Sequence, residues 1–130
     1  AEAVKQGYAL NLPERVVAGA GAGAGAGEGA GAGALAPLVA SDSEQIVVEA
    51  VKLAEDASGD VIVRVYEAHG TRGQARLSLG FDASGVVVTD LLERALDAGD
   101  AAAAVPVDLV DGGVALALRP FQVLTLRFAR

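Results

Sequence analysis

The sequence predicts an all-β fold, an antiparallel β-sandwich interrupted by one flexible segment rich in glycine and alanine. Three observations lead to this prediction. Short runs of Val, Ile and Leu alternate with polar residues, turn-forming residues separate the runs, and no long stretch shows a helical period. The four residues Asp-Ala-Ser-Gly also occur twice, at 56–59 and 82–85, each time before an apolar run. Short strands joined by tight turns are typical of a sandwich.

Composition divides the chain into three parts. In residues 1–17, the alternation in Tyr8–Pro13 predicts a short strand that ends at the proline. Residues 18–36 are mostly alternating glycine and alanine, which have almost no side chain to bury, so we expect a flexible loop or linker. A phosphate-binding loop is excluded there because every glycine lies at an odd position, whereas the G-x-G-x-x-G spacing needs both parities. Residues 37–130 are expected to form the sandwich.

The stretch Ile46–Ala68 predicts the central β-hairpin. Its two runs carry apolar residues at odd positions: Val47, Val51, Leu53, Val61, Val63 and Val65. These two faces can look the same way only if the loop holds an odd number of residues. Asp56–Gly59 therefore predicts a three-residue loop with Gly59 in the left-handed conformation. This register pairs Leu53 with Val63.

The same register places Glu49 directly opposite Glu67, with Cβ atoms ~4.5 to 5.5 Å apart. Carboxyl groups ~5 to 5.5 Å apart are what a retaining glycosidase uses, so a catalytic pair is one interpretation. The alternative is that the pair lies at the open end of the hairpin, where Arg64 or Arg76 neutralises one carboxylate. We favour the alternative, because a slip of two residues would separate the two side chains.

The remaining chain predicts further strands and turns. Residues 74–81 alternate, with one apolar face made by Ala75, Leu77, Leu79 and Phe81. The second Asp-Ala-Ser-Gly is expected to reverse the chain into a strand over 86–92. Residues 93–104 suggest a short helix or a surface loop. Strands are expected over 107–110, 114–118 and 121–128, with a turn at 111–113 and a break at Pro120.

Charge and composition exclude several classes of protein. The net charge of −7 and the lack of clustered Lys and Arg argue against nucleic-acid binding. No apolar run approaches the ~20 residues of a membrane span, and no N-terminal signal peptide is apparent, so we expect a cytoplasmic protein. The chain has no cysteine, which excludes thiolate metal sites. Its one histidine, His69, is expected to be a solvated loop residue rather than a base or a ligand.

Several blocks of the sequence share a resemblance. They are Val51–Asp56, Gly59–Arg64, Tyr66–Glu67, Thr89–Arg94, Leu118–Val123 and Thr125–Arg127. In order and spacing they resemble the C-terminal β-sandwich region of glycoside hydrolase family 38, the α-mannosidases. The resemblance covers roughly residues 37–130, and Tyr8–Asn11 resembles the segment just before it. Ala95 stands where proline is expected, and the Gly-Ala segment is foreign to the pattern.

The resemblance implies that catalysis takes place in another region of the enzyme. In that family the zinc ligands and the carboxylate nucleophile lie in an N-terminal catalytic region, so this chain is expected to hold no catalytic residue, cofactor or metal. It would be a non-catalytic accessory domain, with the catalytic region as its partner. The alternatives are a module that binds a glycan and a free-standing interaction domain. Candidate contacts to a second domain or a ligand are Arg64, Tyr66 and Glu67.

Overall fold

The computed structural model describes residues 2–11, 36–97, 99–100 and 104–130. The chain divides into two units, Glu2–Ala36 and a compact unit that runs from Pro37 to Arg130. Each unit is described by itself. No described helix is long and apolar enough to cross a membrane.

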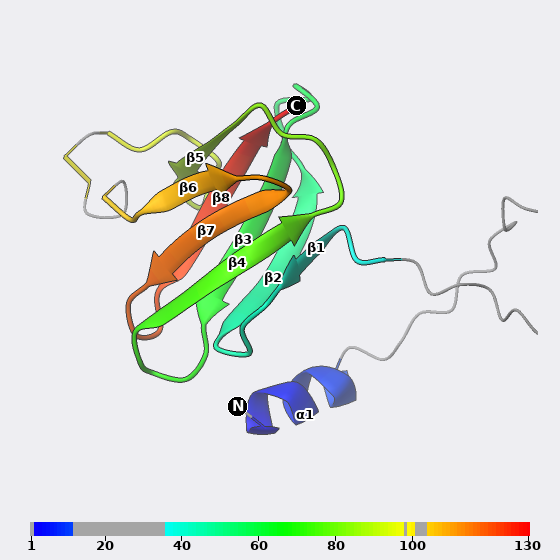
Figure 1. Cartoon of the computed structure of the whole chain (residues 1–130), viewed down its shortest axis with the longest axis vertical. Helices are drawn as coiled ribbons and strands as arrows, with labels where there is room; N and C mark the ends of the chain where they lie inside the picture. Colours follow the sequence, from blue (N-terminus) through cyan, green and yellow to red (C-terminus); the bar gives the residue numbers. More distant parts are fainter. Residues whose placement is uncertain (1, 12–35, 98, 101–103) are drawn as a thin grey trace, which may run out of the picture. The chain divides into compact units, whose positions relative to one another are not determined.

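The compact unit is built from two four-stranded antiparallel sheets. Sheet A has the order β1 (Val39–Ser41), β4 (Gly73–Leu79), β7 (Gly113–Leu118), β6 (Val107–Val110). Sheet B has the order β2 (Ile46–Leu53), β3 (Val61–Glu67), β8 (Val123–Ala129), β5 (Gly85–Thr89). In Figure 1, β4 and β7 cross in front of β3 and β8, which shows the two layers. The predicted antiparallel β-sandwich is confirmed.

The core lies between the inner faces of the two sheets. Alternate residues of the central strands are sealed from solvent: Val61, Val63, Val65, Leu77, Val114, Leu116, Leu118, Leu124, Leu126 and Phe128. Phe81 packs edge-on against Phe128, with ring centroids 5.7 Å apart. The expected alternation is confirmed in β4, and the apolar residues of β3 and β7 that were expected inside are buried, although Ile62 on the other face of β3 is buried as well.

The register of the central hairpin differs from the prediction by two residues. Leu53 lies opposite Val61, and Val51 lies opposite Val63. The loop is longer than three residues and runs from Ala54 to Asp60, closed by a hydrogen bond of 2.9 Å from Ala54 N to Asp60 O. Gly59 has the expected positive φ of 89°, but Ala57 also has a positive φ, 59°. The predicted loop was too short because it left no room for the contacts that Asp56 and Asp60 make with β8.

A β-bulge at Glu49 shifts the register again along β2. Val48 faces Val65, but the next paired residue is Ala50, opposite Arg64. The residues that face the core therefore change from even numbers to odd numbers at the bulge, so that Ile46 is buried and the expectation for Val47 is wrong. Glu67 lies opposite Ile46, not Glu49, so the predicted Glu49–Glu67 pair does not form.

Two further expectations need correction. Residues 80–84 do not make a hairpin, because β4 lies in sheet A and β5 pairs with β8 in sheet B. The chain therefore crosses from one sheet to the other there. The following strand ends at Thr89, three residues earlier than the predicted Leu92. Of the two alternatives left open for residues 93–104, the loop is the one seen over 93–97.

The N-terminal segment is helical where it is described. The helix α1 spans Glu2–Asn11, so the strand expected over Tyr8–Pro13 is wrong as far as Asn11. Its sequence is rich in good helix formers, and Gln6 Nε2 donates to Glu2 Oε1 at 2.8 Å, one turn away. The short alternation of apolar residues did not outweigh these preferences. Leu12, Pro13 and the Gly-Ala segment up to residue 35 lie outside the described residues.

Candidate functional site

The outer face of sheet B carries two of the three predicted contact residues. Arg64 and Tyr66 alternate along β3 and lie opposite Thr125 and Val123 of β8. Arg64 Nε donates to Thr125 Oγ1 at 3.4 Å, and Arg64 Nη2 donates to the carbonyl of Leu91 at 3.5 Å. Arg64 thus connects the sheet to the loop after β5. The structure brings Arg64 and Tyr66 to one face, as the alternation indicated.

The loop Asp90–Arg94, called here the 90–94 loop, is closed by its own first residue. Asp90 Oδ1 accepts the N–H groups of Leu92 at 2.8 Å and Arg94 at 3.0 Å, and Asp90 Oδ2 accepts Arg94 Nε at 2.8 Å. The backbone N–H of Asp90 donates to the carbonyl of Arg94 at 2.9 Å. The N–H of Arg94 holds the pKa of the Asp90 carboxyl below its usual value, which indicates that the ionised form is bound.

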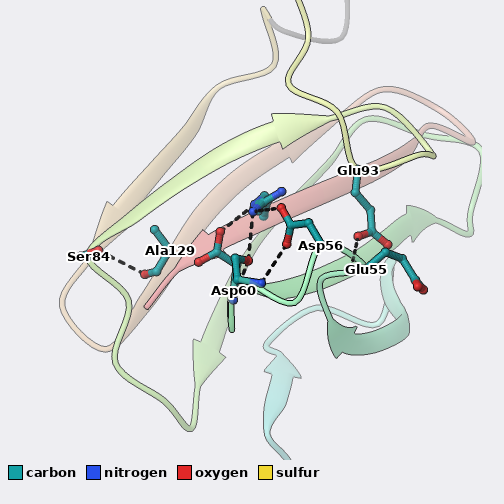
Figure 2. Close-up of polar contacts among 8 residues, drawn as sticks. Glu55, Asp56, Asp60, Ser84, Glu93 and Ala129 are labelled. Carbon is teal, nitrogen blue, oxygen red and sulfur yellow. Dashed lines mark hydrogen bonds and ion pairs between the residues drawn. The ribbon is translucent and has the colours of Figure 1, made fainter.

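Glu93 fixes the same loop to the opposite edge of sheet B. It has a positive φ of 66°, which is unusual for a residue with a side chain. Its Oε1 lies 2.6 Å from Lys52 Nζ on β2, and its Oε2 accepts the N–H of Glu55 at 2.9 Å, as Figure 2 shows for Glu55. The hydrogen bond from Lys52 lowers the pKa of the Glu93 carboxyl. Because sheet order places β5 and β2 at opposite edges, the loop spans the sheet.

The central hairpin turn is held by one arginine of β8. Arg127 Nε lies 2.7 Å from Asp60 Oδ2, and Arg127 Nη2 lies 2.6 Å from Asp56 Oδ2 and 3.1 Å from Ser58 Oγ. Figure 2 shows Asp56 and Asp60 converging on this group. The hydrogen bond from Ser58, followed by that from Arg127, lowers the pKa of Asp56 from 3.8 to about 2. These carboxylates stabilise a turn and are not free for catalysis.

Glu67, the third predicted contact residue, points into the protein. It is 1% exposed. Its Oε1 accepts the N–H of His69 at 2.8 Å, and its Oε2 accepts the N–H groups of Gly70 at 2.8 Å and Phe121 at 2.9 Å. Burial alone would raise the pKa of Glu67, but these N–H groups outweigh burial and lower it. Glu67 therefore cannot touch a ligand directly and instead positions two loops, a correction to the expectation.

Phe121 is exposed, which was not predicted. We expected it in the last strand, but β8 begins at Val123 and Phe121 lies in the preceding turn, 72% exposed. It has a positive φ of 57°, and its ring covers Gly70, where an added Cβ would lie 2.5 Å from the ring. Beside this turn, a hollow of about 350 Å³ is lined in part by Arg72, Gln74 and Arg119. Pro120, which precedes the ring, was the available signal of a turn.

The described residues do not fit a zinc site. Within them, no group of three or more His, Asp or Glu side chains is arranged to hold a metal ion. His69 is half-buried rather than fully solvated, and its Nε2 is shielded without a hydrogen-bond partner in the described part of the chain. A general base needs a partner that orients it, and His69 has none there.

Comparison with known proteins identifies the fold family. Residues 45–126 match the family described as "Glycosyl hydrolases family 38 C-terminal beta sandwich domain". The chain belongs to this family. The family 38 sandwich is also 36% identical over 86 residues to the human protein "Alpha-mannosidase 2C1". The aligned part covers 65% of this chain but only 8% of the length of that relative. The predicted family is confirmed.

Proposed function

We propose that this chain is the non-catalytic C-terminal accessory domain of a zinc-dependent α-mannosidase that acts on mannose-containing glycans. Its role would be to pack against the catalytic region and support its fold. The single observation that carries the proposal is the match of residues 45–126 to the C-terminal sandwich of family 38. The similarity to an α-mannosidase, of which the aligned segment is 8%, points the same way.

The use of the carboxylates supports a structural role. Glu67 binds backbone N–H groups, Glu93 binds Lys52, and the two aspartates of the hairpin bind Arg127. Each of these groups completes a turn or joins two strands. A glycosidase needs one carboxylic acid and one carboxylate facing a shared substrate cleft. The zinc and its ligands would lie in the catalytic region.

Two measurements test this proposal. The purified chain should not hydrolyse a nitrophenyl α-mannoside, with or without added zinc. Deleting residues 37–130 from the α-mannosidase that carries this chain should lower its melting temperature and its turnover together, because packing partners stabilise each other. Turnover by the chain alone, or a truncated enzyme as stable and active as the intact one, would contradict the proposal.

A second candidate function, glycan binding, is favoured by one observation. The exposed ring of Phe121 stands at the same end of the sandwich as the hollow lined by Arg72, Gln74 and Arg119. Sugar faces stack on exposed aromatic rings, and planar polar side chains hydrogen-bond sugar hydroxyls. Phe121 thus joins Tyr66 as a candidate contact for a glycan.

A titration with mannose oligosaccharides separates the two functions. Glycan binding predicts saturable binding at millimolar concentration or below that Phe121→Ala abolishes and Val87→Ala, an exposed change on sheet B, preserves. Nuclear magnetic resonance shifts of the Gly70 and Gln74 amides would report it directly. The accessory role alone would remain if these amides show no shift at any glycan concentration and the intact enzyme melts at a higher temperature than the enzyme that lacks residues 37–130.

A further inference from the structure

The 90–94 loop presents two adjacent apolar side chains to solvent. Leu91 is 65% exposed and Leu92 is 71% exposed. Next to Leu91, a hollow of about 260 Å³ is lined in part by Leu96, Val123 and Thr125. Val123 is itself exposed and belongs to the outer face of β8. Leu91 and Val123 thus line one hollow, which Asp90 also lines, and Leu92 follows Leu91 in the loop. The two leucines, the hollow and Val123 are called here the Leu91–Leu92 surface.

This surface is rigid before any partner arrives. The carboxylates of Asp90 and Glu93 make five polar contacts of 2.6 to 3.0 Å that close the loop and fix it to Lys52 and Glu55. Beneath the loop, Ile62 and Thr125 on the outer face of sheet B are buried. A loop held in this way loses little conformational freedom on binding, so exposed leucines on it are well suited to act as anchors.

We propose that the Leu91–Leu92 surface is the docking site for the catalytic region of the same α-mannosidase. This inference rests on the proposed function and names the contact through which the support is given. The partner is the remainder of the enzyme because the human relative has most of its length outside the aligned segment, so a large surface is available to cover these leucines. A second copy of this chain is the competing occupant.

The charges around the surface define the chemistry of the partner. Glu55, whose side chain is 81% exposed, adjoins Glu93, and Asp97 is exposed after the loop. Asp100 lines the hollow beside Leu91. The chain as a whole carries a net charge of −7. Basic groups lie there too, since the side chain of Arg94 is 72% exposed in the loop and Arg64 reaches the carbonyl of Leu91. A partner that covers the leucines would therefore offer an apolar pocket with both acidic and basic side chains at its rim, because opposite charges favour the encounter and like charges oppose it.

The test compares two variants in the isolated chain and in the full-length enzyme that carries it. The double variant Leu91→Ser/Leu92→Ser removes the anchors, and Leu109→Ser makes the same change at an exposed leucine of sheet A. In the isolated chain both variants should keep the parent melting temperature, because the side chains are exposed. In the full-length enzyme, the double variant should release the sandwich, so that limited proteolysis separates it from the catalytic region at least tenfold faster. Leu109→Ser should leave that rate unchanged.

Each other outcome overturns the inference. Equal proteolysis rates for the double variant, Leu109→Ser and the unmodified enzyme would show that the leucines anchor nothing. A concentration-dependent dimer of the isolated chain that the double variant abolishes would assign the surface to a second copy. Failure of the proposed function is recognised separately: deletion of residues 37–130 would then leave the stability and activity of the enzyme unchanged, whatever the leucine variants do.

Discussion

Replacing Val63 by aspartate tests whether the inner face of β3 is the centre of the core. Val63 is 0% exposed and lies between Val51 of β2 and Leu126 of β8. The substitution loses the burial of a valine side chain, ~1.5 to 3 kcal/mol. It also leaves a buried polar group without a partner, ~1 to 3 kcal/mol even when the carboxyl takes up a proton. The two terms together, ~2.5 to 6 kcal/mol, are a large part of the ~5 to 15 kcal/mol free energy of unfolding of a typical domain, so we expect a strongly lowered urea midpoint.

Val87→Asp is the matched control for this experiment. Val87 is 50% exposed on the outer face of β5, opposite Arg127, so the same change should cost less than ~0.5 kcal/mol. Val63→Thr keeps the shape of valine and provides a milder probe, with an expected loss of ~1 to 3 kcal/mol. Urea unfolding followed by circular dichroism measures all three variants. Equal midpoints for Val63→Asp and Val87→Asp would refute the assignment of the two faces.

Four further changes probe other parts of the structure. Gly113→Ala should destabilise the domain by ~1 to 3 kcal/mol in thermal melts, because the new Cβ would lie 2.2 Å from the carbonyl oxygen of Leu77. At Gly85 an added Cβ would have no atom within 4 Å, so Gly85→Ala should be neutral or stabilise the domain by up to ~1 kcal/mol. A lower melting temperature for this variant would contradict the backbone conformation described at Gly85. Folding lowers the pKa of Asp56 from 3.8 to about 2, so its stabilisation is complete above about pH 4 and is lost as the pH falls through 2. Asp56→Asn should therefore unfold with a shallower dependence on pH between 4 and 2, and an unchanged slope would contradict the role of Asp56. Glu67→Gln should lower the melting temperature, because an amide offers one acceptor where the carboxylate uses two, and an unchanged melt would show that the two loops do not depend on it.

The strands were predictable because burial of one sheet face imposes a period of two. Val61, Val63 and Val65 follow it without exception, and so do Val114, Leu116 and Leu118. The bulge at Glu49 was not predictable from that period. A bulge sets two residues against one, and nothing in the alternation of Val47 and Val51 shows where the extra residue is placed. The register therefore depended on tertiary contacts. The observed pairing buries Ile46 and lets Asp56 and Asp60 of the turn contact Arg127 of β8.

The repeated Asp-Ala-Ser-Gly shows how far local sequence determines a turn. At 56–59 it forms a hairpin loop with Ala57 and Gly59 at positive φ, whereas Gly85 has no positive φ and its segment crosses between sheets. The difference lies in the contacts with β8. Asp56 and Ser58 bind the side chain of Arg127, while Ser84 binds the carbonyl of Ala129 through its N–H and its hydroxyl (Figure 2). Tertiary contacts selected one of two conformations open to the same four residues.

The candidate contact residues were predictable only in part. The alternation of β3 placed Arg64 and Tyr66 on the outer face, and this is where they lie. The same alternation puts Glu67 on the face of Val65, but it could not show that the buried carboxylate would be bound there, because the N–H groups that bind it come from His69, Gly70 and the distant Phe121. The exposed leucines at 91 and 92 were also missed, because an apolar pair after a valine run predicts that the strand continues.

The β-bulge at Glu49 also bears on edge-to-edge association between copies of this protein. β2 forms an outer border of its sheet, where unpaired backbone N–H and C=O groups can template the growth of fibres. The extra residue interrupts the regular spacing of those groups, and the adjacent charges of Glu49 and Lys52 face water. Both features oppose the addition of a long, regular strand from a second molecule at this border.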